Sequence, residues 1–262
     1  LVNTGTMNHA TELVEIPKLL ISETRTSIQF FDMIHNLRQI DDPIFAHSLN
    51  VAMIARMLGK WLNFSEEDFA GLASLTLAAA LHDVGKFLIP SDILNKKEKL
   101  TDNEFALIKQ HPVLGYDLLK ELNIDYHVKQ AALSHHERCD GSGYPLGLKT
   151  NEIDDHAMII SIADVYDAMT SARKYRTPLC PFEVIAEFEK DGLSKYKPQY
   201  ILTFLEHIAN AYQNNRILLN DGRSANIILL NSNHLSSPMI QLDDGTCLDL
   251  YREPNLYIKS VV

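Results

Sequence analysis

Residues 82–86 read His-Asp-Val-Gly-Lys, and we expect the fold to be organised around this pentapeptide. The apolar run before it, residues 72–81, has the spacing of a buried helix, so His82 and Asp83 would lie at the inner end of a packed element. Two adjacent helical side chains point about 100° apart, which suits a site for two ions with the carboxylate between them. Gly85 should let the chain leave the helix, and Lys86 adds a cation beside the carboxylate. Taken alone, the pentapeptide fits a helix end with a hydrogen-bonded His-Asp pair better than a metal site.

The composition is that of an ordinary soluble globular protein. Of the 262 residues, 46% are hydrophobic and 22% are charged, which suits one large or two smaller domains with an ample core. The formal net charge of −10 argues against a nucleic-acid duplex or an anionic membrane, so we expect neither DNA nor a membrane as a partner. A small anionic ligand would need a locally positive pocket.

Cysteine usage and hydropathy indicate the compartment. Cys139, Cys180 and Cys247 are scattered and form no CxxC pair, so neither a disulfide framework nor a thiolate zinc site is predicted. The longest apolar run is too short to cross a bilayer, and no charged-then-apolar signal opens the chain. We therefore expect a cytoplasmic protein, and we expect residues 1–6, which precede Met7, to be a remnant of expression rather than part of the fold.

Three segments are predicted along the chain. Residues 7–42 form a short helical preface, residues 43–214 form a helical body, and residues 215–262 form a small β-rich subdomain. The last segment carries four short strand-like runs separated by turns at Asp221-Gly222 and at residues 243–245. These runs predict a small β-meander packed on the helical body.

Capping residues and prolines predict where the helices of the body begin. A helix over residues 47–61 should face inward through Val51, Ile54 and Leu58, with His47 one turn earlier on the same face. A second helix should begin at Ser65 and run into the pentapeptide. Further helix starts are predicted at the capping box of Thr101 and Glu104, and at Pro112, Asp125, Pro181 and Pro198.

These predicted helices carry metal-capable side chains at their ends or on their inner faces. The side chains are His47, His82, Asp83, His111, His135, His136 and Asp164. A core with so many unpaired imidazoles would cost roughly 1–3 kcal/mol for each unsatisfied group, whereas metal ions would give all of them partners. Imidazole and carboxylate ligands without a thiolate suit iron, manganese, zinc or cobalt. His127, His156 and His207 lack supporting neighbours in the sequence, and we expect them to be surface or core residues.

Three motifs stand together in the body: His82-Asp83, the run His-His-Glu-Arg-x-Asp-Gly-x-Gly-Tyr-Pro at residues 135–145, and Ala-Asp-Val-Tyr-Asp-Ala-Met-Thr at residues 163–170. With them the chain resembles the HD-GYP family, a branch of the HD-domain metal phosphohydrolases that hydrolyses the bacterial messenger cyclic di-GMP. The resemblance covers residues 43–176, about half of the chain, and the run at residues 135–145 is its specific part. It implies a mainly α fold, an HD-domain-like helical bundle.

Carried over to the matching positions, the resemblance implies a binuclear metal centre. His47, His82, Asp83 and Asp164 would hold one ion, whereas His111, His135 and His136 would hold the second, with Asp83 bridging both. Two divalent ions, iron or manganese, are expected, and zinc, cobalt or nickel would also fit. Some members of the family hold a third ion through a Glu one turn before the first His. Pro43 occupies that position here, which favours two ions over three.

The resemblance also implies which residues act on the substrate. Lys86 would contact the scissile phosphate beside Asp83. The substrate pocket would be shaped and charged by Gly143, Tyr144, Pro145, Arg173 and Arg176. Among their neighbours, Glu137 and Arg138 are expected to orient a metal-bound imidazole. Asp167 is expected to cap a helix or to pair with one of the two arginines.

The expected reaction follows from this centre. Two ions about 3.5–4 Å apart would activate a bridging water for in-line attack on phosphorus, so cyclic di-GMP would be hydrolysed at its 3′–5′ phosphodiester to pGpG, to GMP or to both. Two alternatives stay open. One is an HD-type phosphohydrolase that acts on another cyclic dinucleotide or a nucleotide. The other is a non-catalytic module that binds cyclic di-GMP and signals through a partner protein, and the helical preface would serve either such a partner or a homodimer.

Overall fold

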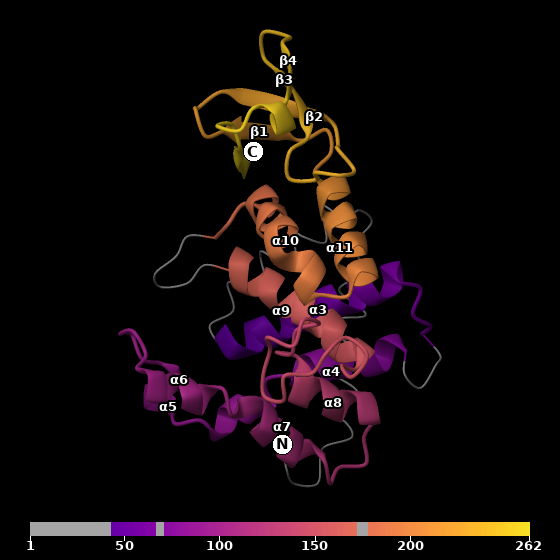
Figure 1. Ribbon diagram of the computed structural model, residues 1–262, viewed down its shortest axis with the longest axis vertical. Helices are drawn as coiled ribbons and strands as arrows, with labels where there is room; N and C mark the ends of the chain where they lie inside the picture. The colour runs from indigo at the N-terminus through magenta and orange to yellow at the C-terminus, as the bar shows by residue number, and fades with distance from the viewer. Residues whose placement is uncertain (1–42, 67–70, 172–177) are drawn as a thin grey trace.

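The computed structural model of the protein describes residues 43–66, 71–171 and 178–262 (Figure 1). The helical preface predicted for residues 7–42 and the predicted substrate residues Arg173 and Arg176 lie outside the described residues. In the described part the helices come first and a small sheet comes last, so the predicted mainly α fold with a β-rich C-terminal subdomain is confirmed. The helices are α3 (Pro43–Trp61), α4 (Leu72–Leu81), η1 (Val84–Leu88), α5 (Ser91–Leu94), α6 (Asp102–Ile108), α7 (His111–Leu119), α8 (Tyr126–Ser134), α9 (Asp155–Thr170), α10 (Pro181–Lys195), α11 (Pro198–Ala211) and η2 (Leu250–Arg252).

Helices α3 and α4 pack against each other. Val51, Ile54 and Leu58 of α3 are fully buried, as the helical spacing predicted. Helix α4 carries apolar side chains around most of its circumference and therefore lies inside the bundle. It begins at Leu72, with Gly71 in an extended conformation as its N-cap, so the predicted start at Ser65 was wrong. The backbone carbonyl of Ser65 instead accepts a hydrogen bond from the N–H of Leu72 at 2.9 Å.

The turn after α4 brings the pentapeptide against α7. The helix ends at Leu81, His82 is its C-cap, and Asp83 leads directly into the 3-10 helix η1. Gly85 therefore does not end the helix as predicted, because it lies inside η1. A Cβ at this position would collide with the carbonyl oxygen of His111 and the amide nitrogen of Gly115. The glycine thus allows two backbones to touch, and this contact holds the turn carrying Asp83 next to the start of α7.

Replacing Gly85 by Ala should destabilise the fold by about 1–3 kcal/mol, because the backbone of α7 cannot yield as the end of a flexible side chain can. Urea unfolding of the two proteins measures this difference. Gly192→Ala in α10 is the matched control, since a Cβ there would meet its nearest neighbours at 3.6–3.7 Å, an ordinary contact. A Gly85→Ala protein as stable as the control would contradict the close approach.

Helices α6 to α8 begin where their capping residues predicted. Thr101 and Glu104 form the expected capping box: the Glu104 N–H donates to Thr101 Oγ1 at 3.3 Å, and the Thr101 N–H donates to Glu104 Oε2 at 2.7 Å. Pro112 lies in the first turn of α7, and Asp125 caps α8 by accepting from the N–H of His127 at 3.1 Å. Because α7 packs on η1 and α8 packs on α4, these helix ends lie close to the pentapeptide.

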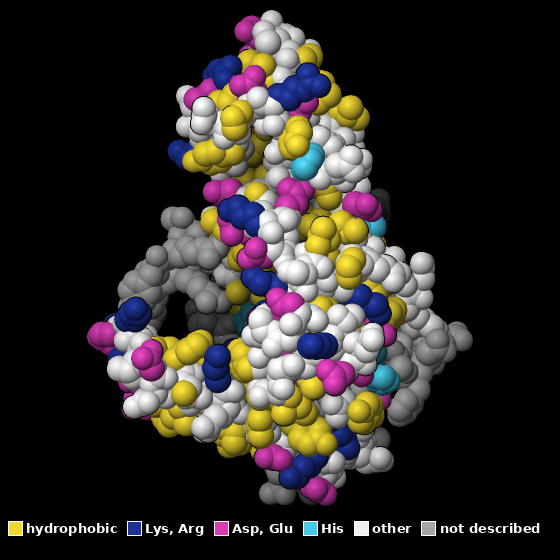
Figure 2. All heavy atoms as spheres, viewed as in Figure 1, with side chains coloured by type: hydrophobic (Ala, Val, Ile, Leu, Met, Phe, Trp, Pro, Cys, Tyr) yellow, Lys and Arg dark blue, Asp and Glu magenta, His cyan; other side chains and the backbone are white. Residues whose placement is uncertain are grey.

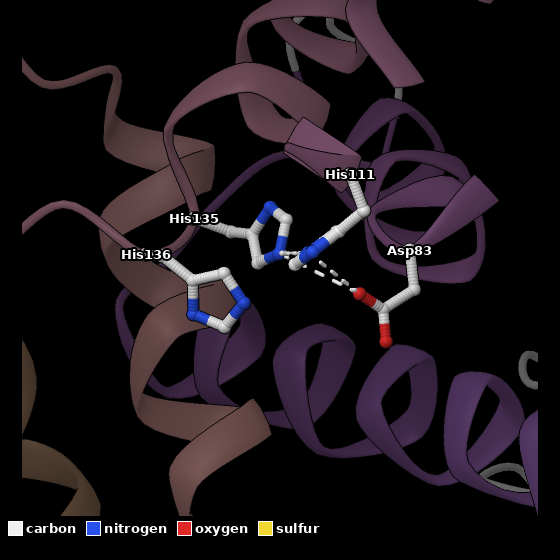
Figure 3. Close-up of side chains that lie close together, drawn as sticks. All are labelled: Asp83, His111, His135 and His136. Carbon is white, nitrogen blue, oxygen red and sulfur yellow. Dashed lines mark hydrogen bonds and ion pairs between the residues drawn. The ribbon is translucent and has the colours of Figure 1, made fainter. Parts of the chain in front are cut away.

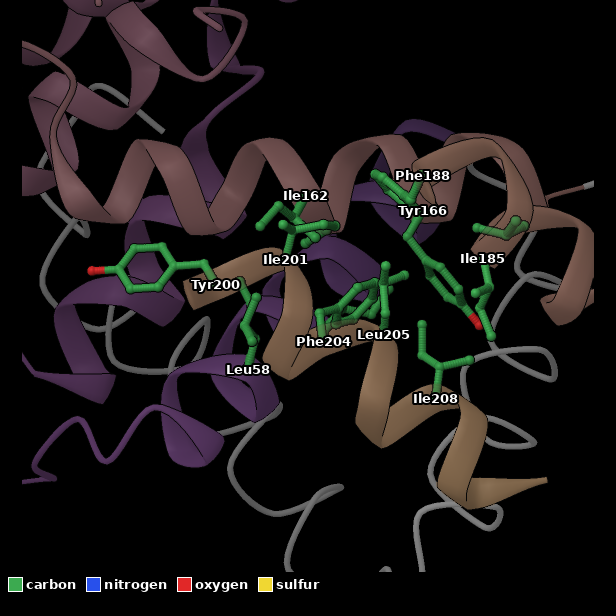
Figure 4. Packing of buried hydrophobic residues seen from close by; sticks show 14 of the residues in the cluster. Leu58, Ile162, Tyr166, Ile185, Phe188, Tyr200, Ile201, Phe204, Leu205 and Ile208 are labelled. Atoms are coloured by element: carbon green, nitrogen blue, oxygen red, sulfur yellow. The ribbon is translucent and has the colours of Figure 1, made fainter. Parts of the chain in front are cut away.

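Helices α9, α10 and α11 complete the hydrophobic core (Figure 4). Figure 4 shows Ile162 and Tyr166 of α9 facing Phe204 and Leu205 of α11. The rings of Tyr166 and Phe204 meet edge to face, with their centroids 5.2 Å apart. Helices α10 and α11 each begin at a proline, as predicted, because a first-turn residue needs no intrahelical N–H bond. This packing holds α9, which carries Asp164, against α3.

The C-terminal segment forms an antiparallel sheet beyond α10 and α11 (Figure 1). The strands are β1 (Arg216–Leu219), β2 (Ser224–Leu229), β3 (Met239–Leu242), β4 (Cys247–Asp249) and β5 (Ile258–Val261). Their order in the sheet is β4-β3-β2-β1-β5, so the predicted meander is present. The sequence did not predict β5, which pairs with β1 through Ile217 and Val261. Gly222 and Gly245 take positive φ values of 90° and 86° in the predicted turns.

The surface in view mixes charges of both signs. Figure 2 shows acidic and basic side chains interspersed over this face rather than gathered into one basic patch. Among the described residues, no helix is both long enough and apolar enough to span a membrane.

Candidate metal centre

Asp83 lies between two groups of histidines, and each of its carboxylate oxygens faces one group. Oδ1 lies 3.2 Å from Nε2 of His111 and 3.7 Å from Nε2 of His135. Oδ2 lies 3.4 Å from Nε2 of His82 and 3.6 Å from Nε2 of His47. The side chain is 3% exposed, so this carboxylate interacts with the protein rather than with water. Each of its two oxygens thus faces a different group of imidazoles.

The first group consists of Asp83, His111, His135 and His136, which offer ligand atoms within 4.8 Å of one another (Figure 3). Figure 3 shows the rings of His111 and His135 pointing toward Asp83. Their Nε2 atoms lie 3.2 Å apart. The adjacent residues His135 and His136 follow the last turn of α8, and His111 opens α7, so two helix ends supply the three imidazoles.

The second group consists of His47, His82 and Asp164, whose ligand atoms also lie within 4.8 Å of one another. They come from α3, from the end of α4 and from α9. Nε2 of His47 lies 3.3 Å from Oδ1 of Asp164. Nδ1 of His136 lies 3.9 Å from Oδ2 of Asp164, which joins the two groups into one centre. The structure thus brings together all seven side chains that the sequence proposed as metal ligands.

Backbone carbonyls fix the orientation of three imidazoles in this centre. Nδ1 of His82 lies 2.6 Å from the carbonyl oxygen of Ala79, and Nδ1 of His111 lies 2.8 Å from that of Ile108. Nδ1 of His135 lies 3.0 Å from the carbonyl oxygen of Ala131. A carbonyl only accepts, so each Nδ1 carries the proton and each Nε2 presents a lone pair to the centre. This arrangement is typical of imidazoles that ligate a metal through Nε2.

The residues fit a cationic cofactor because the centre brings acceptors face to face. Nε2 of His82 and Oδ1 of Asp83 are buried and form no hydrogen bond within the described part of the chain. Burial lowers the pKa of His135 to about 4, so this ring is neutral at pH 7 and offers a lone pair. Burial alone would raise the pKa of Asp83, but the positive charge of the neighbouring Lys86 ammonium opposes burial, and that pKa lies well below its usual range. Divalent ions would give these facing acceptors a shared partner.

Asp167 supports His47, a role that the sequence did not predict. Oδ2 of Asp167 lies 2.8 Å from Nδ1 of His47, and its Oδ1 accepts a hydrogen bond from Nδ2 of Asn50 at 3.2 Å. Ser171 also donates to Oδ1, at 3.1 Å. The carboxylate therefore orients the imidazole so that Nε2 faces Asp83 and Asp164. Asp167 lies three residues after Asp164 on the same face of α9, and this spacing is the feature of the sequence that could have indicated its contact with the centre.

Replacing Asp167 by Asn should weaken metal binding about 10- to 100-fold, because the ring of His47 would lose its orienting carboxylate. Competition with a chelator of known affinity measures the change. The control is Asp191→Asn, because within the described part of the chain the exposed carboxylate of Asp191 pairs only with its helical neighbour Lys195. Equal metal affinity in the two variants would show that Asp167 does not position the ligand.

Lys86 and Tyr144 border the centre. Nζ of Lys86 donates to Oδ2 of Asp83, which places a positive charge beside the bridging carboxylate. The ring of Tyr144 stacks on His136, with centroids 4.7 Å apart and planes 24° apart. Nζ of Lys109 lies 4.7 Å from the centroid of the Tyr144 ring, a contact that the sequence did not predict.

The loop that carries Tyr144 is held by Glu137. This buried carboxylate accepts three backbone hydrogen bonds, from Leu146 at 2.7 Å, Gly147 at 3.1 Å and Leu148 at 2.9 Å. The sequence suggested that Glu137 orients a metal-bound imidazole. Among the contacts of the described residues, this carboxylate instead binds the backbone of the loop. A Cβ at Gly143 would collide with the backbone of Glu137 and Arg138, so the loop lies directly on the end of α8.

Arg138 also differs from its predicted role. Its guanidinium donates to the carbonyl oxygen of Glu137 at 3.0 Å and lies 5.1 Å from the centroid of the Tyr196 ring. These contacts tie the loop to the C-terminal end of α10 and do not reach an imidazole. The guanidinium therefore stabilises the base of the loop through a cation–π contact.

Comparisons with known proteins agree with this arrangement. The family model of the HD domain matches residues 15–200. A cyclic di-GMP phosphodiesterase of Thermotoga maritima is 35% identical over 181 residues, which are 68% of this chain and 48% of that protein. A cyclic di-GMP phosphodiesterase of Pseudomonas aeruginosa is 32% identical over 238 residues, which are 89% of this chain and 55% of that protein. This chain thus spans about half the length of these curated relatives.

A solved structure shares the fold. It is an HDG"Y"P protein from Bdellovibrio bacteriovorus, with a TM-score of 0.53 and 18% sequence identity, and the match covers 74% of this chain and 68% of that chain. The helical bundle and its cluster of histidines and aspartates define the class of this protein: a helical domain with side chains that could hold metal ions. The chain belongs to the HD domain family, and the resemblance to HD-GYP proteins drawn from its sequence is confirmed.

Proposed function

We propose that this protein is a metal-dependent phosphodiesterase that hydrolyses the 3′–5′ phosphodiester of cyclic di-GMP to pGpG and, in a second turnover, to GMP. The observation that carries the proposal is the position of Asp83, whose two oxygens face separate groups of imidazoles. The two relatives described above, each called a cyclic di-GMP phosphodiesterase, support the choice of substrate.

Two divalent ions, iron or manganese, form the proposed cofactor, and zinc, cobalt and nickel also suit these donors. His47, His82 and Asp164 would hold one ion, and Asp83 would bridge to the other. The second ion would be held by His111, His135 and His136. When bound, such a pair supplies Lewis-acid activation of water and stabilises charge at phosphorus. The lone pairs held at Nε2 of the buried histidines support this assignment.

The chain itself supplies charge and shape around the phosphate. Lys86 would contact the scissile phosphate, since its ammonium lies beside Asp83 and its side chain is 27% exposed. The loop of Gly143, Tyr144 and Pro145 would form one wall of the pocket, with the Tyr144 ring fixed by stacking on His136. Arg173 and Arg176 would bind the other phosphate oxygens. Such local positive charge is needed in a chain whose net charge is −10.

Another relative supports a second candidate substrate. A 3′3′-cGAMP-specific phosphodiesterase of Vibrio cholerae is 39% identical to this chain over 141 residues, which are 54% of this chain and 32% of that protein. Because cyclic di-GMP and 3′3′-cGAMP differ in one base, a pocket that grips the phosphates would admit both. Discrimination would then depend on the residues that touch the second base.

A substrate panel tests the proposal. Protein purified without oxygen and reconstituted with Fe²⁺ or Mn²⁺ is offered cyclic di-GMP, 3′3′-cGAMP and linear pGpG, and the products are separated by chromatography. Cyclic di-GMP should be cleaved faster than 3′3′-cGAMP, and the double variant His82→Ala, Asp83→Ala should lose both metal and activity. Faster cleavage of 3′3′-cGAMP would select the second substrate. Binding without turnover in the metal-loaded protein would identify a non-catalytic signalling module.

The domain organisation is part of the proposal. Residues 7–42 would form a helical preface, residues 43–214 the catalytic body and residues 215–262 an accessory subdomain. The subdomain packs on the body, because Ile217 and Ile258 of the sheet belong to the same hydrophobic cluster as Phe182 of α10. The preface would join two copies of the chain or dock a signalling partner.

A further inference from the structure

A separate cluster of metal-capable side chains lies where α8 and α9 begin. It consists of His127 in the first turn of α8, Asp154 as the N-cap of α9, and His156 in the first turn of α9, and we call it the α8–α9 cluster. One ligand atom from each residue lies within 4.8 Å of the other two. Nδ1 of His127 lies 2.6 Å from Oδ2 of Asp154. The sequence showed no neighbour for either histidine, because folding alone brings these two helix starts together.

His156 is the unusual member of the cluster. Its side chain is 2% exposed, and neither ring nitrogen forms a hydrogen bond with any described residue. The nearest carboxylate oxygen, Oδ1 of Asp154, lies 3.9 Å from Nδ1, which is too far for a hydrogen bond. A neutral imidazole carries one donor and one acceptor, so a buried ring with neither satisfied indicates an absent partner. The ring stacks on His127, with centroids 4.8 Å apart, and one of its nitrogens lies within 4.8 Å of a ligand atom of His127 and of Asp154.

The charges around the cluster suit one divalent cation. Helix starts by themselves disfavour a cation, but here each is capped by a carboxylate. Asp154 accepts from the N–H of His156 at 2.9 Å, and Asp125 accepts from the N–H of His127 at 3.1 Å. The neighbouring Asp155 is neutralised by Lys197, whose Nζ lies 2.7 Å from its Oδ1. Two carboxylates thus remain to balance one doubly charged ion.

We propose that the α8–α9 cluster binds one divalent transition-metal ion of the zinc type, through one nitrogen of each histidine and one oxygen of Asp154. Such an ion takes its ligands at about 2.0–2.2 Å, which sets tetrahedral ligand atoms about 3.3 Å apart. The 2.6 Å separation of His127 and Asp154 is shorter and therefore contains a shared proton, which the ion would displace. Imidazole donors exclude calcium and magnesium as the preferred ion. The side chain of His127 is 33% exposed, so solvent reaches the fourth position.

The ion would join two helices that also serve the candidate metal centre. Helix α8 leads into His135 and His136, and α9 carries Asp164. The ion would link the N-terminal ends of these two helices, whereas the candidate ligands of the metal centre lie further along each of them. The α8–α9 cluster is therefore assigned a structural role that adds to the proposed phosphodiesterase activity and does not depend on it.

Zinc stoichiometry tests the assignment. The full chain is dialysed against buffered Zn²⁺, and bound zinc is measured by mass spectrometry for the wild type, Asp154→Asn and His127→Gln. Asparagine caps a helix as well as aspartate does, so Asp154→Asn keeps the start of α9 while removing the ligand charge. The matched control is Asp155→Asn, which makes the same charge change one residue along at the carboxylate that pairs with Lys197.

Each cluster variant should bind one zinc ion fewer per chain than the wild type, and Asp155→Asn should bind the wild-type number. Zinc should also raise the melting temperature of the wild type more than that of either cluster variant. If Asp154→Asn does not fold, His127→Gln gives the same measurement at a partly exposed residue. Wild-type zinc content in a folded cluster variant, or an equal loss in Asp155→Asn, overturns the assignment.

Discussion

Replacing Asp83 by Asn should reduce phosphodiesterase activity by roughly 1,000-fold, equivalent to about 4 kcal/mol of transition-state stabilisation. Asparagine keeps the size of the side chain but loses its charge and one of its two acceptor oxygens. Oδ1 and Oδ2 of Asp83 face different groups of histidines, so the change weakens both metal positions at once. Steady-state turnover of cyclic di-GMP, with metal analysis of the same sample, measures the effect.

The control for this prediction is Asp117→Asn, at an exposed carboxylate of α7 that pairs with Lys120. It should retain wild-type metal content and turnover. Loss of metal from the Asp83→Asn protein, together with loss of activity, would support the bridging role. Full metal content with full activity would show that Asp83 does not join the two positions.

Replacing Glu137 by Gln should lower the free energy of unfolding by about 1–3 kcal/mol and raise the KM for cyclic di-GMP about tenfold. One oxygen of the carboxylate becomes an amide donor, so at least one of the three loop N–H groups loses its acceptor. The loop would then release Tyr144 from its stacking position on His136. Urea unfolding measures the stability, and initial rates over a substrate range measure KM.

The matched control is Glu152→Gln, at an exposed residue that accepts one backbone N–H, from Lys149 at 2.9 Å. That change should cost less than about 0.5 kcal/mol and leave KM unchanged. Metal content should stay at the wild-type level in both variants, because within the described part of the chain these two carboxylates bind backbone N–H groups and not an imidazole. Metal loss in Glu137→Gln would instead assign this carboxylate to the centre.

The metal-ligand candidates could be predicted from the sequence because their signals are local or motif-based. The pentapeptide and the run at residues 135–145 identify a family whose ligand pattern can be carried over position by position. Helix starts at Thr101, Asp125 and Pro198 were equally predictable, because a cap acts within a few residues of its own helix.

Apart from the start of α4, which was placed at Ser65 instead of Leu72, the errors concern contacts between separate segments of the chain. Gly85 was expected to end a helix, but its function is a close approach to the backbone of His111. The fifth strand was missed because its pairing with β1 spans more than thirty residues, which no local pattern encodes. The role of Glu137 was misjudged, and the contact of Asp167 with His47 was not foreseen, since a carboxylate's partners depend on which groups folding brings to it.

By itself, the sequence determined the helical class, most helix starts and the identity of the seven candidate ligands, because periodicity, caps and family motifs are properties of short stretches. The family motifs also predicted that Asp83 joins two metal positions, but only the tertiary structure decided that its Oδ1 faces His111 and its Oδ2 faces His82. It alone also paired His127 with His156. Such geometry arises from the packing of helices against one another, and contacts across that packing leave no periodic trace in the chain.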